Sequence, residues 1–292
     1  MSLFPMADLM RHARENRYGV PAFNVNDTYS IAAAIAAAEE EDAPLILMGW
    51  EGELEGPNMV YFSSLAVAAA QKARVPVAIH LDHGTSFAWA QRAIQHGFTS
   101  VMIDSSMLPF DENVAVTRKV VEAAHACGVT VEAELGHIIG ADVVLTEEQQ
   151  RANMTDPDEA ARFVEATGVD ALAVAVGNAH GLYKYTPKLD LERLDTIVQR
   201  VQCHVVMHGG SGTPSLPEAV QLGVTKINIG TDIQVAFRES VKQTLQQYSL
   251  ENLDSTSILG PATEAMKQVM VDRIRLFSAN GQGREADCFL RA

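Results

Sequence analysis

The chain has 292 residues, of which 47% are hydrophobic and 20% are charged, and its net charge at pH 7 is −15. A chain of this length can bury one large core or two modest ones. The acidic balance argues against general binding to nucleic acid or to an anionic membrane, because both require a basic surface. A small anionic substrate remains compatible, because backbone amides can bind phosphate even on an acidic protein.

The sequence predicts a cytoplasmic protein that spans no membrane. It has no apolar run long enough for a membrane span, and its most apolar early segment, residues 30–44, lacks the basic lead-in of a signal peptide. The three cysteines, Cys127, Cys203 and Cys288, show no metal-binding spacing. An odd, sparse count of cysteines suits a reducing compartment better than a disulfide framework.

Short apolar segments rich in β-branched residues alternate with helical segments along the chain. The helical pattern is clear over 86–97, 113–128 and 156–168, and each of these segments closes with a glycine that suits a helix C-cap. Strands separated by single helices imply βαβ units and a parallel sheet. The eight expected strands are residues 18–25, 43–48, 75–82, 99–104, 129–135, 170–176, 203–208 and 225–229.

Eight such units in this length predict an α/β protein with a single (β/α)8 TIM barrel. We expect one catalytic domain over 1–292, with a C-terminal helical extension and a tail at about 278–292 that is flexible or packs on a neighbouring subunit. A doubly wound open sheet is the alternative fold. It is disfavoured because no glycine-rich dinucleotide turn follows the first strand.

Polar residues follow seven of the eight expected strands at their carboxyl ends. Barrel enzymes place their active sites at this end of the sheet. Packing alone does not require such a cluster, so the pattern indicates a functional site. The residues are Asn24, Asp82, His83, Asp104, Glu134, Asn178, His180, His208, Asn228 and Asp232.

Three of these residues are histidines that follow the third, sixth and seventh strands. His83, His180 and His208 could each cap a strand by hydrogen bonding, but their shared position at one barrel end favours a metal. Three imidazoles plus an open position is the ligand pattern of catalytic zinc. His80 shares strand parity with Asp82, so we expect it to point into the barrel and support the site from below.

Two glycine-rich segments follow the seventh and eighth strands. Gly209, Gly210 and Gly212 surround Ser211, and a second segment with small residues, INIGTDI, covers 227–233. The loops after these two strands frequently form the phosphate site of barrel enzymes. Capping of the next helix by its first residues is the competing interpretation of the second turn. We infer a phosphate site beside a metal site.

The motifs HLDHG (80–84), VEAELG (131–136), AVGNAHG (175–181), HGGSG (208–212) and KINIGTD (226–232) resemble the class II, zinc-dependent ketose-bisphosphate aldolases. That family includes fructose- and tagatose-bisphosphate aldolases, and the resemblance runs from about Leu9 to Phe277. It implies a lyase that reversibly cleaves a ketose 1-phosphate or ketose 1,6-bisphosphate to dihydroxyacetone phosphate (DHAP) and an aldehyde. It also implies a homodimer or homotetramer that acts on a small sugar phosphate in carbohydrate metabolism.

The resemblance also implies roles for individual residues. His83, His180 and His208 would bind the catalytic Zn²⁺, Asp104 and Glu134 would hold a second or displaced metal, and Asp82 would be the proton donor. A monovalent cation, Na⁺ or K⁺, would lie near the substrate phosphate. With the pattern at the strand ends, the expected substrate-binding positions are Asn24, Gly181, Gly209, Gly210, Ser211, Asn228, Gly230, Thr231, Asp232 and Ile233.

The chain departs from the family pattern in two places. The family carries a second base on the loop after ELG, usually a glutamate behind two glycines, whereas this chain reads ELGHIIGADVV. Asp142 is our candidate, with Glu147 or Glu148 as alternatives, and a solvated acid without a catalytic role is the competing interpretation. The stretch 255–266 also lacks the arginine that grips the aldehyde-half phosphate in bisphosphate-cleaving members. A non-phosphorylated or longer aldehyde partner is therefore an open alternative.

Other functional classes predict different behaviour. A Schiff-base aldolase needs a lysine at the barrel mouth, but the sixth strand ends in AVGNAHG and Lys226 lies below the mouth. A metal-dependent sugar-phosphate isomerase or epimerase would share the barrel and the enediolate chemistry but release no DHAP. A non-catalytic sugar-phosphate-binding protein is the third alternative, and the intact set of Asp82 and three histidines argues against it.

Overall fold

The computed structural model describes residues 2–143, 146–181, 183, 187–248, 254–283 and 289. Its sheet is a closed barrel in which eight parallel strands pair in chain order and β8 returns to β1. This closure confirms the predicted (β/α)8 barrel over the open-sheet alternative. The strands are β1 (Val20–Asn24), β2 (Leu45–Trp50), β3 (Val77–Gly84), β4 (Ser100–Ile103), β5 (Thr130–Leu135), β6 (Ala171–Val174), β7 (His204–Met207) and β8 (Val224–Ile229).

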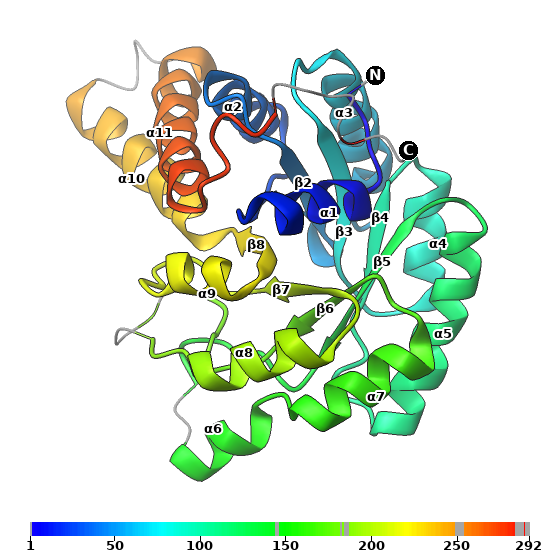
Figure 1. Cartoon of the computed structure of the whole chain (residues 1–292). Coiled ribbons are helices and arrows are strands. Elements are labelled where there is room, and N and C mark those ends of the chain that lie inside the picture. Colours follow the sequence, from blue (N-terminus) through cyan, green and yellow to red (C-terminus); the bar gives the residue numbers. More distant parts are fainter. Residues whose placement is uncertain are drawn as a thin grey trace.

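Helices surround the barrel on its outer side (Figure 1). The three helices predicted over 86–97, 113–128 and 156–168 are α4, α5 and α7. α5 begins earlier than the pattern suggested, because Pro109 precedes a first turn that holds Asp111 and Glu112, where acids suit the helix dipole. The helices are α1 (Met6–Asn16), α2 (Thr28–Glu40), α3 (Asn58–Lys72), α4 (Phe87–Gln95), α5 (Phe110–His125), α6 (Glu147–Asn153), α7 (Pro157–Thr167), α8 (Leu191–Arg200), α9 (Leu216–Leu222), α10 (Thr231–Gln247) and α11 (Ser255–Leu276), with a 3-10 turn η1 (Glu51–Glu53).

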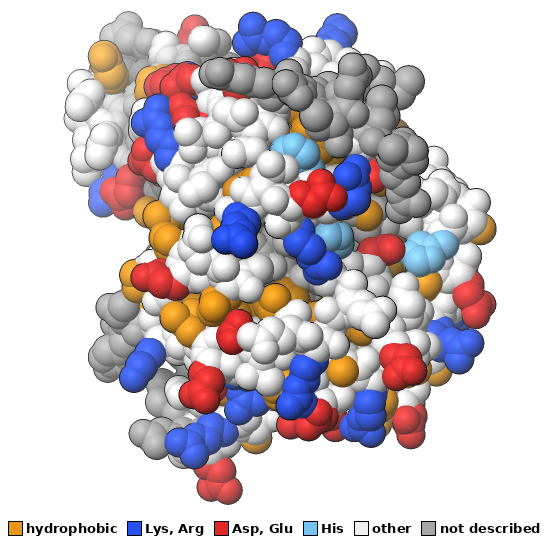
Figure 2. Space-filling model, in the orientation of Figure 1, with side chains coloured by type: hydrophobic (Ala, Val, Ile, Leu, Met, Phe, Trp, Pro, Cys, Tyr) orange, Lys and Arg blue, Asp and Glu red, His pale blue; other side chains and the backbone are white. Residues whose placement is uncertain are grey.

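Helix α1 closes the amino-terminal end of the barrel. The Ala7 amide donates to Thr130 Oγ1 at 3.0 Å, and the Phe4 amide donates to the Val77 carbonyl at 2.9 Å, so this segment covers the starts of β5 and β3. α1 crosses in front of the strands in Figure 1. Figure 2, in the same orientation, shows basic and acidic side chains interspersed over this face. The opposite, carboxyl end of the barrel is therefore the end left for a site.

The strands are buried almost throughout, which suits a parallel sheet covered on both faces. Not all of the buried side chains inside the barrel are apolar. His80, Glu132 and Lys226 are fully buried although each can carry a charge. Buried charges are rare unless they are paired, so this cluster requires a specific arrangement.

The C-terminal extension packs on this same chain. α11 lies beside α10 and α2 (Figure 1), and an ion pair of 2.6 Å joins Arg273 of α11 to Asp232 of α10. Residues 284–288 and 290–292 of the expected tail lie outside the described residues. Phe289 is buried, with its ring centroid 4.2 Å from that of His12. Across the described residues, no helix is long and apolar enough to cross a membrane.

Candidate active site

Three histidines from distant parts of the chain meet at the carboxyl end of the barrel. His83 lies near the end of β3, His180 follows β6, and His208 follows β7. One nitrogen from each ring lies within 4.8 Å of the others. His208 Nδ1 and His83 Nε2 are 3.1 Å apart, close to the roughly 3.3 Å between two imidazole nitrogens on one tetrahedral zinc ion. The sequence-predicted group is therefore brought together.

The backbone and a carboxylate fix the ring of His83. Its φ of 49° lies in the left-handed region, which a non-glycine residue rarely adopts, and the pairing of β3 with β4 shifts register here. His83 Nδ1 lies 2.8 Å from Asp104 Oδ2. This contact leaves Nε2 facing His208 and His180. A strained backbone that over-determines one side chain is typical of functional sites.

The unpartnered atoms at this site fit a metal. His180 Nε2 and Glu134 Oε2 are buried, yet neither has a hydrogen-bond partner among the described residues. A buried polar atom without a partner loses free energy, so a ligand is the expected occupant. Asp104 and Glu134 also form a second potential metal group with His83, again within 4.8 Å. Residues able to hold a metal are thus present in the arrangement expected for the family.

A buried network supports His208 from inside the barrel. Glu132 Oε1 lies 2.8 Å from His208 Nε2, so the His208 Nδ1 atom is left for the site. Lys226 Nζ lies 2.8 Å from Glu132 Oε2 and 3.1 Å from Oε1. His80 Nδ1 contacts Ser100 Oγ at 2.9 Å, and its Nε2 is 3.7 Å from Glu132. The prediction that His80 points into the barrel below the site is confirmed.

Asp82 lies at the end of β3 and is buried. Asn228 Nδ2 of β8 donates to Asp82 Oδ1 at 3.1 Å. Burial raises the pKa of the Asp82 carboxyl above its ordinary value, although the neighbouring His83 opposes the shift. A raised pKa makes the carboxyl bind a proton more readily than an exposed aspartate does, which suits a general acid or base.

A pocket of about 140 Å³ collects most of the expected substrate-binding residues. Met48 and Gln234, which the sequence did not indicate, complete its wall. Asp82 and His180 both line the pocket, so the carboxylate and one of the three candidate metal-binding histidines face the same small space. The predicted residues that line the pocket are Asn24, Asp82, His180, Gly181, Gly209, Ser211, Asn228, Gly230 and Thr231.

The amino-terminal turn of α10 lies beside this pocket, which Gly230 and Thr231 line. The N-cap residue is Gly230, which has no side chain. Capping by the helix's own first residues therefore does not explain the turn. Ser211 Oγ instead accepts from the Asp232 amide at 3.1 Å. A side chain at Gly209 (φ 64°) would clash with the Ala179 carbonyl, so only glycine permits the loops after β6 and β7 to meet. Helix N-termini are suited to phosphate because their first backbone amides have no partner within the helix.

Three of the expected substrate-binding residues do not line this pocket. Gly210 packs against Ile227 beneath the loop, and Ile233 is buried on the other side of α10. The carboxylate of Asp232 is ion-paired with Arg273 and points away from the pocket. Only the backbone of Asp232 is available to a substrate there.

The loop after β5 folds toward the site but leaves its candidate base in solvent. Gly140 forms a parallel bridge with His180, and the His180 amide donates to the Ile139 carbonyl at 2.8 Å. Asp142 follows in a turn, is exposed and does not line the pocket with Asp82. Glu148 is exposed on α6, and the Glu147 side chain lies outside the described residues. The catalytic role of Asp142 stays a prediction.

All three imidazoles and both carboxylates that could hold a metal have shifted pKa values. Burial lowers the pKa of His180 to about 4 and lowers the pKa of His208 well below its ordinary value, which favours the neutral, metal-binding form of both rings. Burial alone would lower the pKa of His83, but Asp82, Asp104 and Glu134 raise it to about 9. Burial, reinforced by the charge of Asp104, raises the pKa of Glu134 to about 8. Asp104, hydrogen-bonded to His83 and Ser106, has its pKa lowered despite burial. The group therefore holds exchangeable protons where a cation would replace them.

Sequence reasoning missed Glu132 as a partner of His208 and did not assign Lys226 a role. A signal was present: Glu132 and Glu134 have the same parity in β5, so both side chains face the barrel interior. A lysine inside an otherwise apolar strand, as in KINI, also requires a buried acid. Neither pattern, however, reveals which strands face each other across the barrel.

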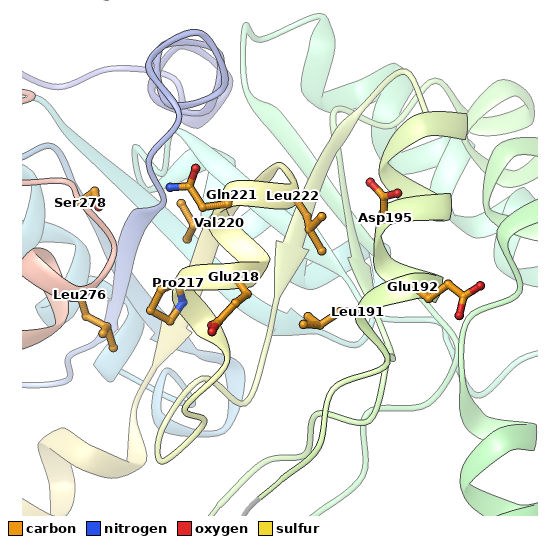
Figure 3. Close-up of a pocket in the computed structure, with 10 residues that line it drawn as sticks. All are labelled: Leu191, Glu192, Asp195, Pro217, Glu218, Val220, Gln221, Leu222, Leu276 and Ser278. Carbon is orange, nitrogen blue, oxygen red and sulfur yellow. The ribbon is translucent and has the colours of Figure 1, made fainter.

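Two other hollows lie away from this group. One is at the amino-terminal end beside α1, where Arg11 and Arg14 line it. The other is a groove of about 620 Å³ between α8, α9 and the end of α11 on the outside of the barrel (Figure 3). None of the expected site residues lines the groove, and its acids do not suit a phosphate. Its apolar residues include Leu191, Leu222 and Leu276, and its acids are Glu192, Asp195 and Glu218.

Comparisons with known proteins agree with this geometry. Residues 4–282 match the family model described as fructose-bisphosphate aldolase class-II. The chain is 41% identical to a fructose-bisphosphate aldolase of Thermus caldophilus, over 94% of this chain and 98% of the relative. It is 42% identical to a probable fructose-bisphosphate aldolase of Bacillus subtilis, over 97% and 100%. The crystal structure of the YdjI aldolase from Escherichia coli K12 superposes with a TM-score of 0.85 at 35% identity, over 96% and 99%.

The fold and the site define a (β/α)8-barrel enzyme. The carboxyl end of its barrel brings together side chains able to hold a metal, beside a turn suited to bind phosphate. The chain belongs to the class II fructose-bisphosphate aldolase family, and it is an aldolase of the lyase class. The resemblance seen in the sequence motifs is thereby confirmed.

Proposed function

We propose that this chain catalyses the reversible, zinc-dependent aldol cleavage of a ketose 1-phosphate or ketose 1,6-bisphosphate to DHAP and an aldehyde. The observation that carries the proposal is the convergence of three histidine nitrogens within 4.8 Å, beside the buried Asp82. The relatives' names support a sugar bisphosphate as the substrate class. Zinc is the proposed metal because three imidazoles with an open position form its catalytic pattern.

Zinc would be held by His83, His180 and His208, with Asp104 and Glu134 available to a second or displaced ion. When bound, it would supply Lewis-acid polarisation of the ketose carbonyl and stabilise the negative charge that develops there. The unpartnered His180 Nε2 and Glu134 Oε2 support this assignment. Glu132 would hold His208 in the tautomer that presents Nδ1, through the 2.8 Å contact at Nε2.

Asp82 would move the proton at the scissile bond. In cleavage it takes the proton from the hydroxyl on C4, the C3–C4 bond breaks, and its electron pair passes to the C2 carbonyl to give an enediolate. In condensation Asp82 returns that proton to the aldehyde oxygen. The Asn228 amide, 3.1 Å from Asp82 Oδ1, would keep the carboxylate directed at the pocket.

The DHAP phosphate would be bound by the turns after β7 and β8. Gly181, Gly209, Ser211, Gly230 and Thr231 line the pocket there, and the amino-terminal turn of α10, a favourable position for an anion, lies beside it. The backbone of Asp232 would contribute, while a monovalent cation, Na⁺ or K⁺, would balance the phosphate charge. Asp142 would be the base that exchanges the DHAP C3 proton when the loop after β5 closes.

We also propose that residues 1–292 form one catalytic domain, that the enzyme is a homodimer or homotetramer, and that it works in the cytoplasm. The sparse cysteines support a reducing compartment. Size measurement in solution would test the oligomeric state.

A coupled assay for released DHAP, applied to a panel of ketose 1-phosphates and 1,6-bisphosphates, tests the proposal. We expect DHAP release that is abolished by EDTA and restored by zinc. His208→Ala should remove bound zinc and activity together. An isomerase would convert the sugar phosphate without releasing DHAP, and a binding protein would hold zinc without exchanging the DHAP proton. Either result, or full turnover after rigorous chelation, would contradict the proposal.

A further inference from the structure

A second hollow adjoins the pocket that contains Asp82. The two share Asn24 and Gln234, and the second extends between the loop after β1, η1, α10 and α11, with a volume of about 260 Å³. Asn24, Asn26, Glu53, Arg238 and Met266 are among its lining residues, and we call it the side pocket. The glycine-rich turns after β7 and β8 line the first pocket, so the side pocket offers space for the other half of a substrate.

The wall of the side pocket nearest the site is rich in hydrogen-bond acceptors. Asn24 Oδ1 is buried and has no partner among the described residues. Glu53 Oε1 accepts from Asn26 Nδ2 at 3.0 Å, and across the part of the chain that the structure describes no donor contacts Glu53 Oε2. Free acceptors in a half-buried wall require donors, and a sugar hydroxyl is both small enough and a donor.

The charge on this wall opposes a phosphate. Asp27 caps α2 and lines the side pocket with Glu53. Burial, and then the charges of Asp82 and Asp27, raise the pKa of Glu53, so these carboxylates share one electrostatic environment. A dianionic phosphate placed between them would add repulsion to both.

The cation at the side pocket lies at its outer part. Arg238 is exposed and has no ion pair within the described ranges. It is seven residues beyond Thr231, so it lies about 10 Å further along the α10 axis than the start of the helix. The stretch 255–266, which follows in the chain, contains no lysine or arginine. Among the described residues that line the side pocket, the part nearest Asp82 therefore has carboxylates but no cation.

We propose that the side pocket binds the aldehyde half of the substrate and selects an unphosphorylated, polyhydroxylated aldehyde, with Glu53 as the specificity-determining residue. The proposal rests on the proposed aldolase function and narrows its substrate. Hydroxyl groups of the aldehyde donate to Asn24 Oδ1 and Glu53 Oε2. A phosphate, which has only acceptors to offer when ionised, meets two carboxylates instead. This substrate differs from the bisphosphate in the relatives' names.

Condensation with DHAP tests the proposal whatever the stereochemistry of the product. The zinc-loaded enzyme is given DHAP with two matched pairs, D-glyceraldehyde against D-glyceraldehyde 3-phosphate and D-erythrose against D-erythrose 4-phosphate. We expect kcat/KM to favour the unphosphorylated member of at least one pair by about tenfold or more. Glu53→Gln, which preserves the acceptor for Asn26, should reduce that preference about tenfold by removing one like charge.

Two further variants separate this effect from a general change in charge. Glu55→Gln removes an exposed acid two residues away that does not line the side pocket, and it should leave the preference unchanged. Arg238→Met should also leave the preference unchanged. A marked loss of kcat/KM for the phosphorylated aldehydes in Arg238→Met would show that Arg238 binds their phosphate. This result would overturn the proposal.

Exchange of the DHAP C3 proton with solvent is measured in parallel, because it needs no aldehyde. Absence of exchange in the zinc-loaded protein would be a failure of the proposed aldolase function. If proton exchange occurs, three results would overturn the side-pocket proposal alone. They are a preference for the phosphorylated aldehydes, no condensation of any of the four aldehydes, and a preference that Glu53→Gln leaves unchanged. Circular dichroism and zinc content of each variant establish that folding and metal loading are unchanged.

Discussion

Lys226 Nζ lies 2.8 Å from Glu132 Oε2, and both side chains are fully buried in the interior of the barrel. Glu132 contacts His208 through its other oxygen at 2.8 Å. The ion pair between β5 and β8 thus positions the imidazole of His208, one of the three candidate metal-binding histidines. Buried ion pairs contribute little net stability but cost much when one partner is removed.

Lys226→Met should leave Glu132 as an uncompensated buried charge. We expect a loss of about 3–5 kcal/mol in unfolding free energy and a roughly 10- to 100-fold loss in zinc affinity as His208 loses its support. Urea unfolding and competition with a zinc chelator measure the two effects. The double variant Lys226→Met/Glu132→Gln should recover much of the stability, because the remaining amide is neutral.

Lys242→Met is the matched control for that experiment, because among the described residues Lys242 pairs with Glu239 alone, on the exposed surface of α10. It should change stability by less than about 0.5 kcal/mol. Unchanged zinc affinity in Lys226→Met would show that the buried pair does not position His208.

Asp82→Asn should separate metal binding from catalysis. The amide keeps the shape of the side chain but cannot take a proton, so we expect cleavage to fall about 10²- to 10⁴-fold. Zinc content and DHAP binding should be close to those of the unaltered protein, since His83 is held by Asp104 and His208 by Glu132 rather than by Asp82. Metal analysis and DHAP titration check this. Loss of zinc in Asp82→Asn would mean that the aspartate has a structural part in the metal site.

Zinc binding should release protons and strengthen as pH rises. With pKa values of about 9 for His83 and about 8 for Glu134, both groups are protonated at pH 7 in the metal-free protein. A metal binds only the neutral imidazole. The apparent affinity of the protein for zinc should therefore rise by up to about tenfold per pH unit between pH 6 and 8 for each proton released. Above pH 9 the dependence should flatten.

Calorimetry in two buffers of different ionisation enthalpy counts the released protons. Release of no proton at pH 7 would show that His83 is already neutral in the metal-free protein. His125→Gln is a suitable control, because that histidine contacts Asp170 on the outside of the barrel and should not alter the proton count.

Asp142→Asn tests the base on the loop after β5. If Asp142 moves the DHAP proton, solvent exchange of that proton should slow about 10²-fold or more while zinc affinity stays constant. Glu148→Gln, which alters an exposed acid on α6, serves as the comparison. Equal exchange rates in Asp142→Asn and the unaltered enzyme would assign the step to another group, and slowing in Glu148→Gln would point to α6.

Much of the fold followed from local patterns. The eight apolar segments became strands because their β-branched residues are covered on both faces by other elements. Gly168 caps α7 with a φ of 68°, as its place at the end of a helical pattern predicted. The position of His83 or Asp82 at a strand end could also be read directly. Side chains at strand ends share one end of a parallel barrel whatever the details of packing.

By itself, the sequence predicted the eight strands, the end of the barrel at which polar side chains gather and the candidate site residues there. It did so because strand periodicity and position at a strand end are local properties of the chain. Only the tertiary structure decided that Glu132 and Lys226 meet across the barrel, that Asp232 turns to Arg273, and that Glu53 faces the space beside Asp82. Those contacts join segments dozens of residues or more apart, and their geometry depends on closure and register of the whole sheet.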